Sequence, residues 1–376
     1  MYDIAYSRCP DYEYSRVRPA LEDVLAQVTD FSWLRPGMTV AIKANLVTGA
    51  APERAATTHP AVIQALCDIL SEKGARPIVG DSPGGPYTAV WLRHVYAACG
   101  LTALRNVTLN QDLSELHISA PEAAICREFD CTAYLTRADA VISLCKLKTH
   151  GMMSLTAGVK NLFGAIPGTK KPEYHFRFPR PGDFADALVD ICQYFSPVLT
   201  VCDAVIAMEG NGPTAGTPYH AGLLAAAPNP HALDASLARL IGLDPLSVPT
   251  IAAAQRRRLL LSTPSVSGQP EPLADFVLPD TGGILFEGRG GLSGRIRSAV
   301  LNCCLSARPV LDTAHCSGCG KCAAICPAEA ITLRGGQPHI HRSRCIRCFC
   351  CQEFCPRGAL HARRSPIARL INKEVH

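Results

Sequence analysis

The sequence contains no apolar run close to the roughly 20 residues that a helix needs to cross a bilayer. Residues 1–20 are polar and rich in tyrosine, and they lack the apolar core of a secretion signal. We therefore expect no membrane span and a cytoplasmic location. Hydrophobic residues make up 48% of the 376 residues and charged residues 18%, which is ordinary for a globular protein with a buried core.

A nicotinamide or flavin fingerprint is also missing. The glycines of residues 288–294 do not complete a G-x-G-x-x-G motif because position 293 is serine, and no clear strand precedes them. The surrounding segment, 262–295, is rich in proline, glycine and serine. We interpret it as a linker with a short strand near Phe276, in preference to a nucleotide site.

Cysteine, by contrast, is abundant. The chain has 19 cysteines, and eleven of them lie between Cys303 and Cys355. In a chain of this size without a leader, metal binding is favoured over disulfides. The eight earlier cysteines occur mostly singly among apolar residues, so we interpret them as small buried hydrophobic side chains. We expect Cys303 and Cys304 to be packing residues in a short helix, 296–305.

Positive charge gathers at the C-terminal end. Residues 301–376 contain eleven Lys and Arg and four Asp and Glu, a net charge of +7, whereas the whole chain carries +5. Each four-thiolate cluster carries about −2 when oxidised, so the excess offsets cluster charge. It also offers a docking face for an acidic redox partner. We expect no nucleic-acid partner.

Two cysteine runs repeat at an offset of 29 residues: Cys316-x2-Cys319-x2-Cys322-x3-Cys326-Pro327 and Cys345-x2-Cys348-x2-Cys351-x3-Cys355-Pro356. This stretch resembles bacterial ferredoxins with two [4Fe–4S] clusters, in which the fourth cysteine of each run binds the other cluster. The resemblance implies two crossed ligand sets: Cys316, Cys319, Cys322 and Cys355 for one cluster, and Cys345, Cys348, Cys351 and Cys326 for the other.

Structural zinc is the alternative for these cysteines. Zinc sites take four ligands, usually in pairs, and two runs of four that each end in Cys-Pro do not follow that pattern. Cys350 is additional to both runs, and we interpret it as a bystander.

The first part of the chain alternates between strand and helix patterns. We expect strands at 39–47, 77–80, 140–145 and 198–207, and helices at 60–74, 88–99, 154–163, 183–195 and 231–241. Such alternation predicts an α/β layered domain with a largely parallel sheet. The expected divisions are an α/β domain at 1–261, a linker and short helix at 262–305, a small α+β ferredoxin domain at 306–365 and a basic tail at 366–376.

Several motifs of the first part occur together: residues 41–46 (AIKANL), 58–60 (THP), 80–83 (GDSP), 146–150 (KLKTH), 158–164 (GVKNLFG) and 208–213 (MEGNGP). This set resembles the family called domain of unknown function 362, over residues 1–260. The family is often fused to a ferredoxin module. The resemblance implies the architecture and leaves the reaction open.

The same motifs predict a cationic pocket. Lys146, Lys148 and His150 alternate after an apolar strand, so period two places them on one face at the strand's C-terminal end, where open α/β sheets bind ligands. Lys43 and Asn45 share a strand face by the same rule, and Thr156 and Lys160 a helix face. As catalytic residues we predict Lys148, His150 and Lys160; as residues that bind a cofactor or substrate, Lys43, Asn45, Lys146, Asn161 and Glu209. The alternative is a set of surface lysines beside a strand.

We hypothesise an iron–sulfur redox enzyme. Electrons would pass singly from the clusters to an anionic small molecule in the α/β domain, with a lysine or His150 as proton donor. One alternative is a non-catalytic electron carrier whose α/β domain docks a partner protein. Another is a redox-sensing or cofactor-assembly protein. A pocket lined by these side chains favours the enzyme, and a filled surface favours the carrier.

Overall fold

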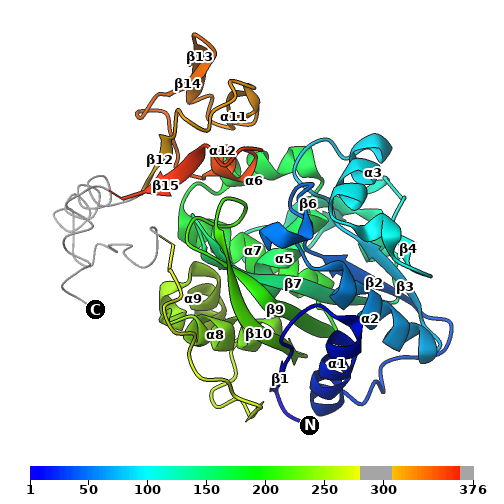
Figure 1. Cartoon of the computed structure of the whole chain (residues 1–376). Helices are drawn as coiled ribbons and strands as arrows, with labels where there is room; N and C mark the ends of the chain where they lie inside the picture. The colour runs from blue at the N-terminus through cyan, green and yellow to red at the C-terminus, as the bar shows by residue number, and fades with distance from the viewer. Residues whose placement is uncertain (280–306, 365–376) are drawn as a thin grey trace.

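A computed structural model of the chain describes residues 1–279 and 307–364. Figure 1 shows an α/β domain built on one large sheet, with a small C-terminal module seated on it. In order across the sheet, the strands are β11 (Val266–Ser267), β1 (Ile4–Arg8), β10 (Thr217–Ala227), β9 (Leu199–Glu209), β7 (Ala140–His150), β2 (Thr39–Ala44), β3 (Arg76–Gly80) and β4 (Thr108–Leu109), and β8 (Ser154–Thr156) pairs with β7.

The sheet is largely parallel, as the sequence predicts. Strands β9, β7, β2, β3 and β4 run parallel to one another. Strand β10 is antiparallel to both β9 and β1, and β8 is antiparallel to β7. The parallel strands therefore end at a common edge, which is the usual place for a ligand in such sheets.

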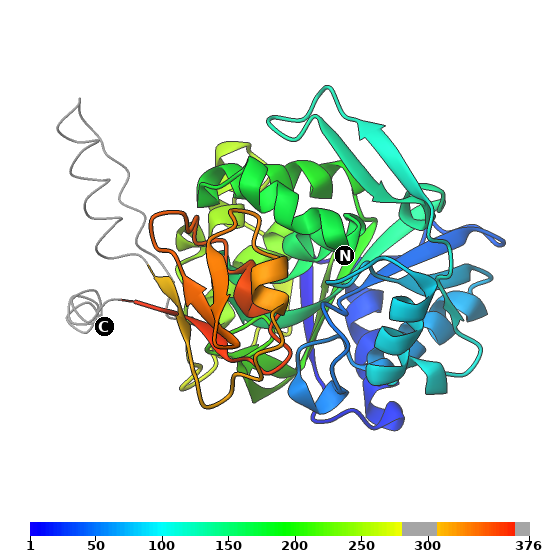
Figure 2. The same ribbon diagram turned by 90° about the horizontal axis from the view of Figure 1, so that it is seen from above.

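Helices cover both faces of the sheet. Helices α1 (Tyr14–Val28), α2 (Pro60–Glu72) and α3 (Ala89–Ala98) pack on one face. Helices α5 (Gly158–Asn161), α7 (Pro181–Phe195), α8 (Pro230–Leu240) and α9 (Pro249–Arg256) pack on the other. Figure 2 shows the two layers from above, blue to cyan on one side and green on the other. Smaller elements are the hairpin β5 (Glu115–Ser119) and β6 (Glu128–Thr132), and helices α4 (Ala133–Thr136) and α6 (Lys171–Arg177).

Strand β7 is buried along its whole length. Ile142 and Leu144 join the hydrophobic cluster under α1 and α2, whereas Cys145 and Leu147 join the cluster under α8. This alternation follows from the period of two in a strand. The strand continues five residues beyond the predicted end at 145, because its polar C-terminal half pairs with β8 and β9.

The predicted helix over 154–163 is wrong in its first half. Ser154–Thr156 forms β8, whose Thr156 pairs with Lys148 of β7. The helix proper begins at Gly158, where the Asp234 carboxylate accepts hydrogen bonds from the amides of Gly158 and Val159. Thr156 and Lys160 therefore lie on different elements and do not share a helix face.

Residues 262–279 pack along the α/β domain. Val266 pairs with Ile4, and Phe276 is buried among the side chains under α8. The short strand lies at Val266–Ser267 and not near Phe276, where the prediction put it. The glycines of 288–294 and the predicted helix at 296–305 lie outside the described residues.

The C-terminal module repeats one small motif twice. Its strands are β12 (Arg308–Leu311), paired with β15 (Leu360–Arg363), and β13 (Ile331–Arg334), paired with β14 (Gln337–Ile340). Its helices α11 (Lys321–Ala324) and α12 (Cys350–Glu353) begin 29 residues apart, which is the offset of the cysteine runs. The structure thus contains the predicted small α+β module.

The module contacts the α/β domain through α12. Gln352 donates hydrogen bonds from its side chain to the carbonyls of Asn211 and Gly212, at 3.0 and 3.1 Å. Its carbonyl accepts a weaker bond, at 3.5 Å, from the hydroxyl of Thr214. These contacts hold α12 against the loop that follows β9.

The structure also bears on membrane crossing. Within the described ranges, no helix combines the length and the apolar character that a bilayer span requires.

Candidate functional site

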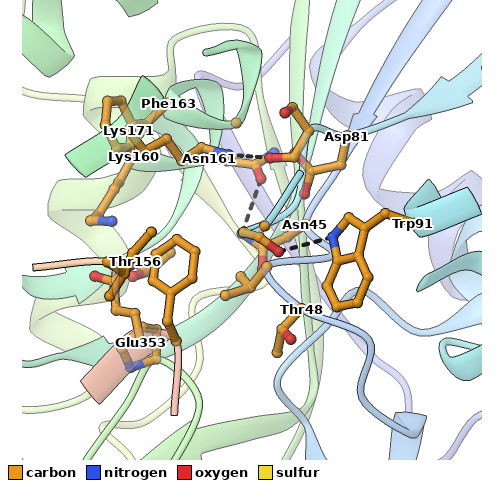
Figure 3. A pocket seen from close by; sticks show the side chains of 18 of the residues that line it. Asn45, Thr48, Asp81, Trp91, Thr156, Lys160, Asn161, Phe163, Lys171 and Glu353 are labelled. Carbon is orange, nitrogen blue, oxygen red and sulfur yellow. Dashed lines mark hydrogen bonds between the residues drawn. The ribbon is translucent and has the colours of Figure 1, made fainter. Parts of the chain in front are cut away.

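A cavity of about 410 Å³ lies between the sheet edge and the module, and Figure 3 shows it from close by. This volume lies within the usual range for small-molecule sites. The α/β domain lines it with residues of β2 and β7, with residues of the segments that follow β2 and β3, and with residues of α3, α5 and α6. The module closes it with Lys321, Ala324, Ile325, Glu353, Phe354 and Pro356.

The predicted site residues divide into two groups. Lys43, Asn45, Lys148, Lys160 and Asn161 line the cavity, and Lys146, His150 and Glu209 do not. Sequence reasoning missed the cavity's Trp91, Lys171, Glu353 and Phe354 as ligand-binding candidates.

A buried ion pair forms one wall. Lys43 and Asp81 lie 2.7 Å apart with almost no exposed surface. Asp81 also accepts a hydrogen bond from the amide of Leu46 at 2.7 Å, which fixes the end of β2 against the end of β3. Burial lowers the pKa of Lys43, and the charge of Asp81 opposes that shift. The two charges of this pair therefore largely balance each other, and the pair contributes to the shape of the wall more than to the charge of the cavity.

Lys148 reaches the cavity from β7. Its ammonium donates to Asn45 Oδ1 and to the carbonyl of Ala56, each at 2.7 Å. Burial lowers the pKa of Lys148 well below its usual value, and the nearby charge of Lys160 adds to this effect. A lysine with a depressed pKa gives up its proton more readily than an exposed lysine.

Lys160 differs from the other cavity lysines. No hydrogen bond or ion pair joins its ammonium to the described residues, and the ammonium lies over the ring of Phe163, 5.7 Å from its centroid. Its charge nevertheless acts on Lys148, Lys171 and Glu353. Lys160 is thus a cation in the cavity lining whose donors the described protein groups leave free.

Two hydroxyl groups in the same lining are buried without a hydrogen-bond partner among the described residues. They are Thr156 Oγ1 and Ser82 Oγ. A buried hydroxyl without a partner costs free energy, so a bound molecule or water is expected to satisfy each of them.

Lys171 is a cavity residue that sequence reasoning missed. Its ammonium donates to the carbonyl of Ser82. Burial lowers its pKa to about 8, and the charge of Asp81 partly offsets this effect. Lys171 begins α6, 91 residues after the end of β3, so no local pattern links it to the site.

Aromatic rings form another part of the wall. Trp91 donates its indole N–H to the carbonyl of Gly84 at 3.0 Å. A Cβ atom on Gly85 would lie 2.8 Å from that indole nitrogen, and a Cβ on Gly84 would lie 2.8 Å from a ring carbon of Phe354. The two glycines therefore allow the loop to pass close to both rings.

His150 lies outside the cavity. Its Nδ1 accepts hydrogen bonds from the amides of Met152 and Met153, at 3.0 and 3.1 Å. The proton of a neutral ring must then be on Nε2, which lies 2.7 Å from the Glu353 carboxylate. Burial lowers the pKa of His150 to about 4, so the ring is neutral at pH 7. Its position suits a link between β7 and the module better than proton delivery to the cavity.

Lys146 and Glu209 also have partners elsewhere. Lys146 pairs with Asp203 at 2.9 Å and donates to the hydroxyl of Tyr12 at 2.7 Å. Glu209 accepts a hydrogen bond from the amide of Val277 at 2.7 Å. Lys146 thus joins β7 to β9 and to Tyr12, and Glu209 joins β9 to the segment that contains Val277.

The module contains two further small cavities, each with four of the predicted cysteines. Cys316, Cys319, Cys322 and Cys355 line one, and Cys326, Cys345, Cys348 and Cys351 line the other. Amides donate to two of the sulfurs: Ala330 N to Cys326 and Ala359 N to Cys355, both at 3.2 Å. The thiol sets and these donors fit the crossed cluster ligation that the sequence predicts.

Cys350 is buried and lies beside the second cysteine-lined cavity. In the described ranges, no group of three or more His, Cys, Asp and Glu side chains is gathered closely enough to hold a single metal ion.

Two family models match the chain. Residues 40–239 match the model described as domain of unknown function (DUF362), and residues 308–356 match the 4Fe-4S dicluster domain. The second match supports iron–sulfur clusters and electron transfer in the C-terminal module.

A curated relative and two solved structures extend the comparison. The thylakoid-associated protein sll1697 of Synechocystis sp. is 33% identical over 266 residues, which cover 67% of this chain and 78% of that protein. A Thermotoga maritima protein has 11% identity and a TM-score of 0.34, over 54% of this chain and 52% of its own. The lactate racemase apoprotein of Thermoanaerobacterium thermosaccharolyticum has 9% identity and a TM-score of 0.41, over 65% and 58%.

Proposed function

The chain belongs to the family described as domain of unknown function (DUF362), and from this premise we propose that it is an iron–sulfur oxidoreductase that reduces an anionic small molecule. In this proposal the C-terminal module holds two [4Fe–4S] clusters in the crossed ligand sets described above. The molecule to be reduced binds in the 410 Å³ cavity. A redox partner protein supplies the electrons.

One observation carries the proposal: the cavity and the first cysteine-lined cavity share Lys321 and Pro356 in their walls. Only the shared residues Lys321 and Pro356 would thus separate a molecule in the larger cavity from the proposed cluster ligands Cys322 and Cys355. A pocket of this size beside the cysteines favours an enzyme over a simple carrier, whose α/β domain would need no cavity there.

When bound, such clusters supply single electrons at potentials that the protein environment sets. The side chains of this chain supply the remaining functions. Lys160 offers its free donors to an anion. Lys148 and Lys171, both with lowered pKa values, can hold or release a proton beside the reacting molecule.

The division into domains and the location of the protein are part of the same proposal. We take residues 1–261 as the substrate-binding domain and 306–365 as the electron-transfer domain, joined by 262–305 and followed by a basic tail at 366–376. We propose a cytoplasmic location and a role in anaerobic metabolism.

The test begins with protein purified without oxygen. Small molecules that co-purify with it are released and identified by mass spectrometry. Each is then added to the dithionite-reduced protein, and the visible absorbance of the clusters is followed. The proposal expects a co-purifying anion that reoxidises the clusters. If only partner proteins reoxidise them, and no small molecule does, the chain is an electron carrier.

A further inference from the structure

The two sides of the cavity differ in chemistry. Figure 3 shows Lys160 and Thr156 on one side and Trp91 on the other. The first side offers a free ammonium and a buried hydroxyl without a partner. The second offers the indole of Trp91, one face of which stacks on His94, and Phe354 of the module is another ring in the lining.

We propose that the occupant of this cavity is a planar, conjugated carboxylate, with its carboxylate at Lys160 and Thr156 and its ring system against Trp91 and Phe354. This inference deepens the proposed function, since it names the substrate class of the same site. It concerns binding alone, so it can be tested without any electron transfer.

The supply of free donors favours a single carboxylate. Lys43 is engaged by Asp81, Asn161 and the carbonyl of Ala44. Lys148 has two acceptors of its own. The Lys160 ammonium and the Thr156 hydroxyl match the two oxygens of a carboxylate, and the Ser82 hydroxyl is the other lining hydroxyl without a partner among the described residues. A phosphate with two charges requires more free donors.

The acidic groups of the lining also favour a ligand with a single carboxylate. Asp81 and Glu353 also line the cavity, and each already faces a basic partner, Lys43 and His150 respectively. A second anionic group on the ligand would meet these two carboxylates, so a ligand with one charged end fits better.

The aromatic end favours a flat body. Trp91 is fixed by its bond to Gly84, and the glycine at 85 leaves no side chain between the loop and the indole. Stacked rings of this kind gain about 0.5–1.5 kcal/mol beyond simple burial. A saturated ring of equal size is thicker and loses that stacking.

The experiment uses the oxidised, cluster-loaded full chain and four probes: 2-naphthoate, 2-naphthamide, decalin-2-carboxylate and inorganic phosphate. Binding is measured by titration calorimetry and by quenching of Trp91 fluorescence in a Trp33→Phe background. The proposal expects 2-naphthoate to bind at least tenfold more tightly than each of the other probes.

Variants locate the two ends of the ligand. Lys160→Met is expected to weaken 2-naphthoate at least tenfold, and Thr156→Val severalfold. Trp91→Leu is expected to abolish the preference for 2-naphthoate over decalin-2-carboxylate. Lys73→Met is the matched control, because Lys73 also lies over an aromatic ring, 4.5 Å from that of Phe31, but far from the cavity. It should leave binding unchanged.

The substrate class is overturned if the amide or the phosphate binds as tightly as 2-naphthoate, if no probe binds, or if Lys160→Met has no effect. None of these results touches the proposed function, which fails separately if no small molecule reoxidises the reduced clusters.

Discussion

The imidazole of His150 faces the carboxylate of Glu353 across 2.7 Å, and this contact joins the end of the central strand to the C-terminal module. His150 has no exposed surface, and its Nδ1 is already occupied by two backbone amides. Glu353 lies between Cys351 and Cys355, which bind different clusters in the proposed ligation. The contact therefore fixes the module where its wall completes the cavity.

Removing this carboxylate should loosen the module. Glu353→Ala removes the carboxylate that faces the buried Nε2–H of His150, at a cost of about 1–3 kcal/mol. Glu353→Gln keeps a carbonyl oxygen and should lose less. Chemical unfolding and amide hydrogen exchange of residues 307–364 measure the effect. Glu329→Ala is the control, because Glu329 is an exposed acid of the same module. Equal losses for the alanine and glutamine variants would show that the charge matters more than the hydrogen bond.

Two lysines, Lys146 of β7 and Lys160 of α5, should respond to substitution in opposite ways. Lys146→Met removes the partner of a fully buried Asp203 and should lower the free energy of unfolding by about 3–5 kcal/mol. Lys160→Met removes a cation that forms no hydrogen bond or ion pair with the described residues, and it relieves the repulsion of Lys148, so stability should hold or rise. Urea unfolding of both variants decides the matter. A large destabilisation by Lys160→Met would mean that its charge is structural.

Much of the architecture and part of the site follow from the sequence. The ends of parallel strands meet at one edge, so Lys43, Asn45 and Lys148 could be placed near each other from their positions after apolar runs. Trp91, Lys171 and Phe354 could not, because α3, α6 and the module meet only through tertiary packing.

Two local errors have a similar cause. Pairing with β7 turned Ser154–Thr156 into a strand against its helical spacing. The period of two in a strand predicted a common face for Lys146, Lys148 and His150, but it could not predict which groups each side chain contacts. Those contacts place Lys148 in the cavity lining and give Lys146 and His150 structural partners.

A pair of glycines tests how closely the cavity wall is packed. A Cβ on Gly164 would collide with Asp81 and Lys43, whereas a Cβ on Gly182 of α7 meets nothing. Gly164→Ala should therefore lower stability by about 1–3 kcal/mol and displace the ion pair. Gly182→Ala should raise stability by about 0.5–1 kcal/mol. Thermal unfolding compares the two, and a neutral Gly164→Ala would show that this wall yields easily.

Ligand affinity should fall as the pH rises through the pKa of Lys171. Burial lowers that pKa to about 8, and Asp81, Lys43, Lys160 and Glu353 are the charged groups that act on it. A bound anion favours the protonated ammonium, so binding takes up a proton and weakens between about pH 7 and pH 9.5. Calorimetry with 2-naphthoate measures both effects. Lys171→Arg stays charged in this range and should remove the pH dependence; if the dependence persists, another group is responsible.

The crossed ligation of the clusters can be separated from an uncrossed one by iron content. Anaerobically prepared protein should contain about eight iron atoms per chain. In the crossed arrangement Cys322 and Cys355 serve one cluster, as their shared cavity suggests, so the double change to alanine should leave about four iron atoms and one electron paramagnetic resonance signal. The double change of Cys322 and Cys351 should remove both clusters, since these residues line different cavities. Cys350→Ala is the control and should keep eight. If the ligation is uncrossed, the two double variants should behave alike, because each of them then removes one ligand from each cluster. A full complement of zinc without iron would contradict the presence of the clusters.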